Sequence, residues 1–229
     1  MTMNRLNKKF LLKLVVSVSL LVFIYFKADK NLLFTTLSKI NWYYLFLIFP
    51  LLIGNYIISS IRWKKLLSIY DTGEVISLFL LVKLYFIGAF FNNFLPTSIG
   101  GDVYKAMKLS QFIKNSSQAF ASTFMERFSG VIVLVIFALY GTVYSFGVKG
   151  LLIIVLFWTL VVLSYLSLGF ISEKIPKIKK FIDAVGEYKH NRSILVYALV
   201  TSVFVQVFSI LTQYFIFISL GAHISISYA

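Results

Sequence analysis

The order of apolar and polar stretches divides this 229-residue chain into helical spans joined by short polar segments. Five apolar runs come close to or exceed the roughly 20 residues that a helix needs to cross a bilayer. These runs are Phe10–Phe26, Trp42–Ile61, Ala119–Phe146, Leu151–Ile171 and Ser193–Ala222. A sixth, Val75–Leu95, is interrupted by Lys83. The pattern predicts an all-α fold, a polytopic helical membrane bundle that forms one transmembrane domain over residues 1–229.

A polar, helix-breaking segment follows the sixth run, between residues 91 and 102. Its side-chain amides, its proline, its glycine pair and its carboxylate belong to Asn92, Asn93, Pro96, Gly100, Gly101 and Asp102. Proline cannot continue a helix, and glycines free the backbone. Such a break is tolerated at membrane depth only where protein or a water-filled cavity supplies hydrogen-bond partners. We therefore expect this segment to line a cavity.

The positions of the basic segments predict how the chain crosses the membrane. Arg62–Glu74 and the amphipathic segment Ser172–Arg192 are both rich in lysine and are assigned to the cytoplasm. Two spans already lie between them, so Val75–Ser117 must enter and leave on the same side. We expect a re-entrant helical hairpin around residues 75–114 with its tip at 92–101. The N-terminus is then cytoplasmic, with an uncleaved first span, and Lys27, Lys30 and Lys39 lie outside.

Composition excludes several classes of protein. With 59% hydrophobic and 13% charged residues, the chain is far from the 25% or so of charged residues in soluble domains. The absence of cysteine excludes disulfides and thiolate chemistry, and two histidines alone make no metal site. The net charge of +14 is read as loop lysines that face anionic lipid, not as nucleic-acid binding. No catalytic motif and no cofactor-binding motif is present, so neither catalytic residues nor a cofactor is expected.

The glycine pair begins a short, charged helix, Val103–Lys114. Free N–H groups at such a helix start form an anion site, here Gly100 and Gly101. Lys105 lies one turn from Asp102 and is able to pair with that acid or with a lipid phosphate. The alternative is a tight turn in which Asp102 only caps the helix.

Glu126 and Arg127 are adjacent, opposite charges near the start of an apolar span. Ionisable groups inside a membrane are costly and indicate a functional site. Neighbouring helix residues point apart, so each needs another partner. Asp102 or a phosphate is expected for Arg127, and Lys83 or Lys105 for Glu126. The alternative is a pair that reaches interfacial water.

Three further polar residues are candidates for cavity lining. They are Lys83, Gln206 and Gln213. Lys83 lines the cavity or, in a shallow hairpin, reaches water. The two glutamines are seven apart on one helix face and either line a polar path or bond neighbouring helices.

Several blocks of residues, in this order and spacing, carry a family resemblance. They are Arg62-Trp63 with Leu66-Leu67, Asn93-Phe94-Leu95-Pro96, Gly100-Gly101-Asp102 with Tyr104-Lys105-Ala106, and Ser122 with Glu126-Arg127 and Gly130. The chain resembles the flippase-like transmembrane family of lysylphosphatidylglycerol synthases and their free-standing relatives. Lys105 stands where that family usually has arginine, and Thr97 where glycine is common. Family members usually continue through further spans, so the resemblance implies a C-terminally truncated product.

The resemblance implies lipid handling, in the best-known members movement of an aminoacylated phospholipid between leaflets. We therefore expect an integral protein of the cell membrane that binds and translocates a phospholipid or lipid-linked headgroup. Lys105 and Arg127 would hold its phosphate. Two alternatives stay open: a lipid-modifying transferase that uses Asp102 or Glu126 as base, and a non-catalytic partner subunit. The partners expected are the lipid and the membrane, with a second copy of the chain or a lipid-synthesis enzyme as candidates.

Overall fold

The computed structural model describes residues 29–70, 76–94, 100–147 and 176–222, with isolated helical positions at 18–27 and 151–159. All regular elements in this part of the chain are helices. They are α2 (Lys30–Ser38), α3 (Trp42–Leu67), α4 (Leu78–Phe94), α5 (Gly100–Ile113), α6 (Ser116–Phe146), α8 (Pro176–Gly186), the 3-10 helix η2 (Glu187–His190) and α9 (Arg192–Ser219). The prediction of an all-α membrane bundle is confirmed. The predicted spans Phe10–Phe26 and Leu151–Ile171 lie largely outside the described residues.

Three described helices are long and apolar enough to cross a membrane: α3, α9 and the segment Ser116–Tyr144 of α6. At a rise of 1.5 Å per residue each is about 40 Å long, more than the hydrocarbon thickness of about 30 Å. Helix α3 continues to Leu67, beyond the predicted boundary at Ile61. The basic residues after Ile61 do not end the helix, because Lys64 and Lys65 in its last turn interact favourably with the helix dipole.

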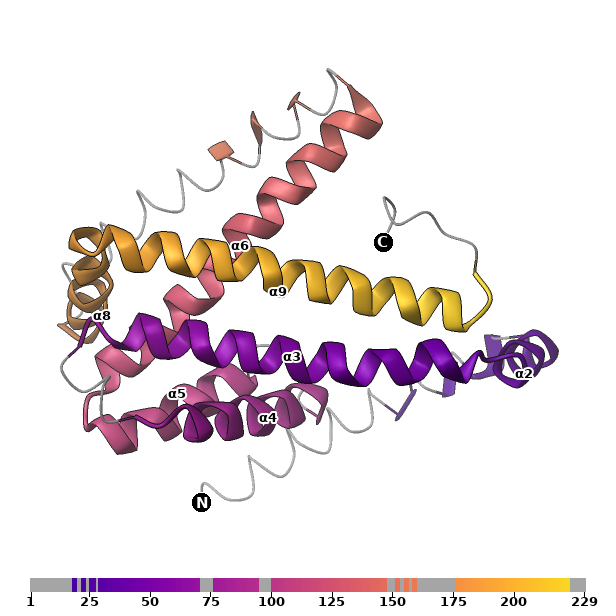
Figure 1. Ribbon diagram of the computed structural model, residues 1–229, viewed down its shortest axis with the longest axis horizontal. Coiled ribbons are helices and arrows are strands. Elements are labelled where there is room, and N and C mark those ends of the chain that lie inside the picture. Colours follow the sequence, from indigo (N-terminus) through magenta and orange to yellow (C-terminus); the bar gives the residue numbers. More distant parts are fainter. Residues whose placement is uncertain are drawn as a thin grey trace.

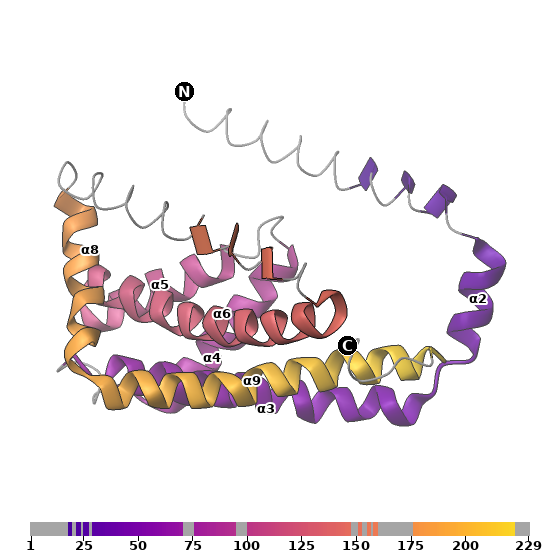
Figure 2. The same cartoon turned by 90° about the horizontal axis from the view of Figure 1, so that it is seen from above.

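Helices α3 and α9 form an antiparallel pair that runs along the molecule (Figure 1). At one end the Asn41 N–H donates to the Ser219 carbonyl at 2.9 Å. At the other end, the Tyr188 hydroxyl donates to the Leu66 carbonyl at 3.0 Å. Helix α8 lies across this second end, and α2 lies across the first (Figures 1 and 2).

Helices α4 and α5 form a hairpin beside α3 (Figure 1). The open end of the hairpin lies at the end of the bundle where α3 stops and α6 begins. The two helices come closest at a glycine pair, because a Cβ atom on Gly101 would collide with the Gly88 carbonyl oxygen. The shape matches the predicted hairpin, whose passage into a membrane from one side stays a prediction.

The bounds of the hairpin helices differ from those predicted. Helix α4 continues through Asn92 and Asn93 to Phe94, and α5 begins at Gly100, three residues before the predicted Val103. The amides therefore belong to a helix and not to the break. Asparagine is only a weak helix breaker, so tertiary packing overrides its preference. Pro96 lies outside the described residues.

Tight packing is concentrated at the end of the bundle where α8 lies. The buried cluster includes Trp63, Leu66 and Leu67 of α3, together with Leu81 and Leu109 of the hairpin. Many other large apolar side chains on the long helices are exposed, as expected for surfaces that face lipid chains. The predicted amphipathic helix is present as α8, and Phe181 packs edge-on against Phe124 at 5.6 Å. This packed end of the bundle adjoins the polar interior that is described below.

Two tyrosines connect α8 and η2 to α3 and make this end of the fold sensitive to alkali. The Tyr70 hydroxyl donates to the Ala184 carbonyl at 2.9 Å. Burial raises the pKa of Tyr70 to about 12 and also raises the pKa of Tyr188.

We expect the free energy of unfolding to fall as the pH rises from about 10 to about 12. Above pH 10 unfolded tyrosine loses its proton while folded Tyr70 retains it, so the unfolded state gains stability. Denaturation of the detergent-solubilised protein at several pH values measures this effect. The Tyr70→Phe variant should show a shallower decline, and an unchanged slope would contradict the role of Tyr70.

Candidate functional site

Three buried charges from three helices meet inside the bundle. Arg62 of α3 forms an ion pair with Glu126 of α6 through Nη2 and Oε1. Lys105 of α5 lies 3.1 Å from the other carboxylate oxygen of Glu126. All three side chains are almost completely buried. The predicted pairing of Glu126 with Lys105 is thus present, and Arg62 is a second partner that the sequence analysis did not assign.

Asp102 continues this arrangement toward Arg127. The Arg127 Nε atom lies 2.7 Å from Asp102 Oδ2, and Nη2 lies 2.8 Å from Oδ1. Lys105 Nζ is also 3.3 Å from Asp102 Oδ1. The five side chains therefore form one row of alternating charge, in the order Arg62, Glu126, Lys105, Asp102, Arg127. We call this the charge row. Arg127 is its accessible end, with a side chain that is 54% exposed.

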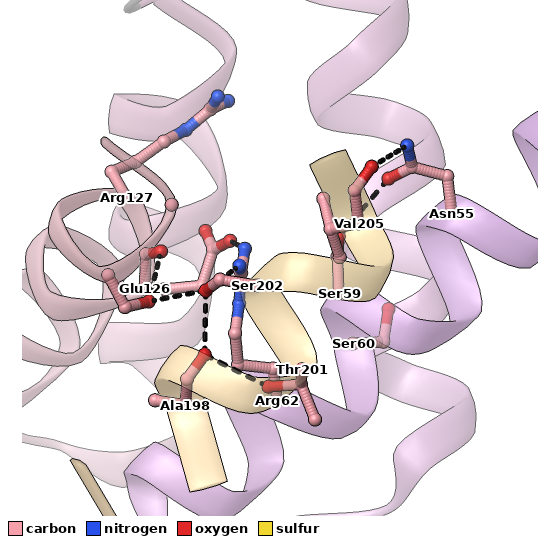
Figure 3. A network of polar contacts seen from close by, with 12 residues as sticks. Asn55, Ser59, Ser60, Arg62, Glu126, Arg127, Ala198, Thr201, Ser202 and Val205 are labelled. Atoms are coloured by element: carbon pink, nitrogen blue, oxygen red, sulfur yellow. Dashed lines mark hydrogen bonds and ion pairs between the residues drawn. The ribbon is translucent and has the colours of Figure 1, made fainter. Parts of the chain in front are cut away.

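Neutral groups hold the charge row in place (Figure 3). Arg62 Nη1 donates to the Ser202 hydroxyl of α9 at 2.6 Å, and Ser202 in turn donates to Ser129 at 3.2 Å. The Lys105 ammonium lies 3.8 Å from the centre of the Tyr85 ring, at a distance typical of a cation–π contact. Figure 3 also shows Arg127 pointing away from Glu126, as expected for neighbours on a helix.

The charge row lies nearer to the end of the bundle that carries α8 than to the other. Arg62 is five residues from the last residue of α3, and Glu126 is ten residues from the first residue of α6. These separations correspond to about 8 Å and about 15 Å along the helix axes.

A cavity of about 500 Å³ adjoins the charge row. All five members of the row line it, together with neutral polar and apolar residues of α3, α4, α6 and α9. The neutral polar ones are Asn55, Tyr56, Ser59, Tyr85, Asn92, Gln206 and Ser209. The cavity thus has a charged wall formed by α5, α6 and Arg62 of α3, and an uncharged wall of amides and hydroxyls from the rest of α3 and from α9.

The structure brings six of the twelve predicted site residues together around the cavity. Those that line the cavity are Asn92, Asp102, Lys105, Glu126, Arg127 and Gln206. Asp102 lies within the first turn of α5 and does not precede it, so capping alone does not describe its role. Gly100 and Gly101 begin α5 as expected, but the Gly101 N–H already donates to Asn92 Oδ1 at 2.7 Å. That backbone donor is consequently occupied. The side chain of Asn93 lies outside the described residues.

Lys83 and Gln213 are exposed and do not line this cavity. Lys83 is two residues before Tyr85, and at 100° per residue it points to the opposite side of α4. Gln213 shares a helix face with Gln206, as predicted, but lies about 10 Å farther along α9. Glu126 therefore pairs with Lys105 and Arg62, and not with Lys83, the other partner that was expected for it.

Two polar stripes contain the main omissions of the sequence analysis, which among their members had assigned only Gln206 to the cavity. Asn55, Ser59 and Arg62 recur on α3 with the spacing i, i+4, i+7, and Ser202, Gln206 and Ser209 recur on α9 with the same spacing. Asn55 Nδ2 joins the stripes by donating to Ser209 Oγ at 3.0 Å. This helical periodicity, set in long apolar runs, is a signal that the sequence carries.

The fold and the site together define a helical membrane domain whose interior holds an ion-paired polar cavity. The chain belongs to the family described as the lysylphosphatidylglycerol synthase TM region, whose family model matches residues 10–229. This match confirms the resemblance drawn from the sequence. No curated protein and no solved structure matches the chain significantly. The family makes this a lipid-related membrane protein.

Proposed function

We propose that the domain binds the headgroup of a phospholipid or lipid-linked substrate in the cavity beside the charge row and moves it between membrane leaflets. The observation that carries the proposal is a row of five charged side chains along a cavity within an apolar bundle, of which Arg62, Glu126 and Lys105 are almost completely buried. Charged groups in such surroundings are expensive and mark the paths of polar substrates.

The energetics of the charge row support a role other than stability. A buried ion pair contributes little net stability, because removing charges from water offsets most of their attraction. Apolar residues of similar size would fill the same space at no greater cost. Retention of Arg62, Lys105 and Glu126 in this position therefore supports a site that handles a charged ligand.

The dimensions of the cavity suit a headgroup and not a whole lipid. A volume of about 500 Å³ is within the usual range for small-ligand sites. The acyl chains would remain on the exposed apolar surfaces of the long helices, for example beside Phe204 and Val131. In this arrangement only the headgroup of the lipid enters the interior of the protein.

The orientation proposed from the basic segments places α8 and the open end of the hairpin in the cytoplasm, with the domain in the cell membrane. Lys64 and Lys65 at the end of α3, and Lys179 and Lys180 on α8, lie at this end. Such clusters favour the cytoplasmic side. A headgroup would then reach the charge row from the nearer, cytoplasmic leaflet.

Lipid movement in liposomes tests the proposal. Arg127→Ala should slow the transfer of labelled lipid between leaflets by roughly ten- to a hundredfold, because hydrogen bonds to charged groups contribute about 1.5–3 kcal/mol. Arg192→Ala is the matched control, since it removes the same charge from an exposed position at the start of α9. Equal rates in both variants and in the unmodified protein would remove the charge row from the mechanism.

A further inference from the structure

We infer that the cavity selects a lipid whose headgroup is a phosphodiester with a net negative charge and no amine. The inference rests on the proposed function and specifies its substrate class. It follows from which hydrogen-bonding groups the charge row has already used, which it has left over, and the sign of its net charge.

The carboxylates of the cavity are already paired with cations of the protein. Both oxygens of Glu126 are paired, one with Arg62 and one with Lys105. Both oxygens of Asp102 are bound by Arg127, and Oδ1 is also shared with Lys105. An amine entering the cavity would have to displace one of these cations, which would leave Arg62 or Lys105 buried without its partner or would release Arg127 from Asp102.

The accessible end of the charge row still offers hydrogen-bond donors. A guanidinium carries five N–H donors, and Asp102 accepts from Nε and Nη2 of Arg127. Arg127 lines the cavity and its side chain is 54% exposed, so a ligand in the cavity can reach its remaining N–H groups. Phosphate oxygens are strong acceptors for a guanidinium.

The net charge points to the same ligand. The lining residues that carry a charge at neutral pH are the three cations and two carboxylates of the charge row, which leaves one positive charge in excess. A phosphodiester with one negative charge neutralises this excess. A zwitterionic headgroup leaves it unchanged, and a lysylated headgroup with a net positive charge increases it. Charge separation of this kind is costly in apolar surroundings.

The second wall of the cavity suits an uncharged, hydroxylated headgroup terminus. Asn55, Ser59, Gln206 and Ser209 offer amides and hydroxyls from α3 and α9, and none of them carries a charge. Such groups both donate and accept hydrogen bonds, as alcohols do. A headgroup with phosphate at one end and hydroxyls at the other therefore matches both walls.

Competition among lipids with identical acyl chains tests the inference. The purified protein is incubated in detergent with equimolar phosphatidylglycerol, phosphatidylethanolamine and lysylphosphatidylglycerol, and the bound lipid is identified by native mass spectrometry. Phosphatidylglycerol should be enriched at least about tenfold over each of the others, a difference of about 1.4 kcal/mol. Arg127→Gln should abolish the preference, whereas Arg127→Lys and the remote control Arg192→Gln should retain it.

The other outcomes separate the two proposals. Equal binding of the three lipids, or preference for the lysylated one, would overturn the inference and leave lipid binding intact. No bound lipid at all would overturn the proposed function as well. A further arm adds glycerol 3-phosphate as a soluble competitor. Displacement of the lipid at equal concentration would show that the site takes soluble phosphates, and the lipid assignment would be wrong.

Discussion

Glu126→Gln is expected to lower the free energy of unfolding by about 3–5 kcal/mol, the usual cost of removing one partner from a buried ion pair. Glu126 is the only carboxylate bound to Arg62 in the described part of the chain, and it also binds Lys105. The substitution keeps the size of the side chain but leaves both cations undercompensated in an apolar interior. Unfolding of the detergent-solubilised protein by denaturant measures the loss.

Glu187→Gln is the matched control for this experiment. Glu187 lies on the exposed surface of η2, outside the charge row, and surface substitutions usually change stability by less than about 0.5 kcal/mol. If Glu126→Gln were as mild as the control, the ionic contacts of Arg62 and Lys105 would not depend on Glu126, and the charge row would not exist in the folded protein.

Gly101→Ala should disrupt the hairpin. The added methyl group would collide with the carbonyl oxygen of Gly88 and would lie 2.7 Å from Asn92 Oδ1. A backbone carbonyl cannot rotate away, so α4 and α5 must separate, at a cost of about 3 kcal/mol, the upper part of the usual range for overpacking. Because the hairpin carries Asp102 and Lys105, lipid transfer should fall together with stability.

A distance measurement distinguishes separation of the helices from general unfolding. The chain has no cysteine, so spin labels can be attached selectively to Lys83→Cys on α4 and Lys108→Cys on α5. Gly101→Ala should lengthen the distance between the labels. Gly141→Ala on α6 provides the control, since a methyl group there meets nothing within 4 Å. An unchanged distance in Gly101→Ala would show that the close approach of the two helices is wrong.

Hydropathy and charge were sufficient to predict the helical class and the three long helices α3, α6 and α9. They also predicted the partners of the adjacent pair, since Asp102 for Arg127 and Lys105 for Glu126 were among the expected alternatives. The physical reason is simple. Charges in an apolar chain have few possible partners, and a hairpin turn brings α5 back beside α6.

Arg62 was missed because of its sequence neighbours. Next to Lys64 and Lys65 it resembles part of a basic stop signal, yet the two lysines are near the helix end while Arg62 is buried on the inner face. Arginine occurs at only four positions of this lysine-rich chain, and that rarity favours a special role for Arg62 as much as for Arg127. The hydrogen bond from the Gly101 N–H to Asn92 Oδ1 could not be predicted from the sequence, because it depends on how two helices pack at atomic distance.

The cavity ends well short of the far side of the bundle, and this has a kinetic consequence. On the side of Asn55 that faces away from Arg62, α3 has ten uncharged, apolar positions from Leu45 to Gly54. This is about 15 Å of helix with no polar side chain that could bind a headgroup during its transfer. A headgroup bound beside Arg62 would have crossed only the shorter part of the distance between the two leaflets. The slow step would then be departure toward the distant leaflet, and it would draw on the headgroups bound beside the charge row, so weaker capture there would slow turnover.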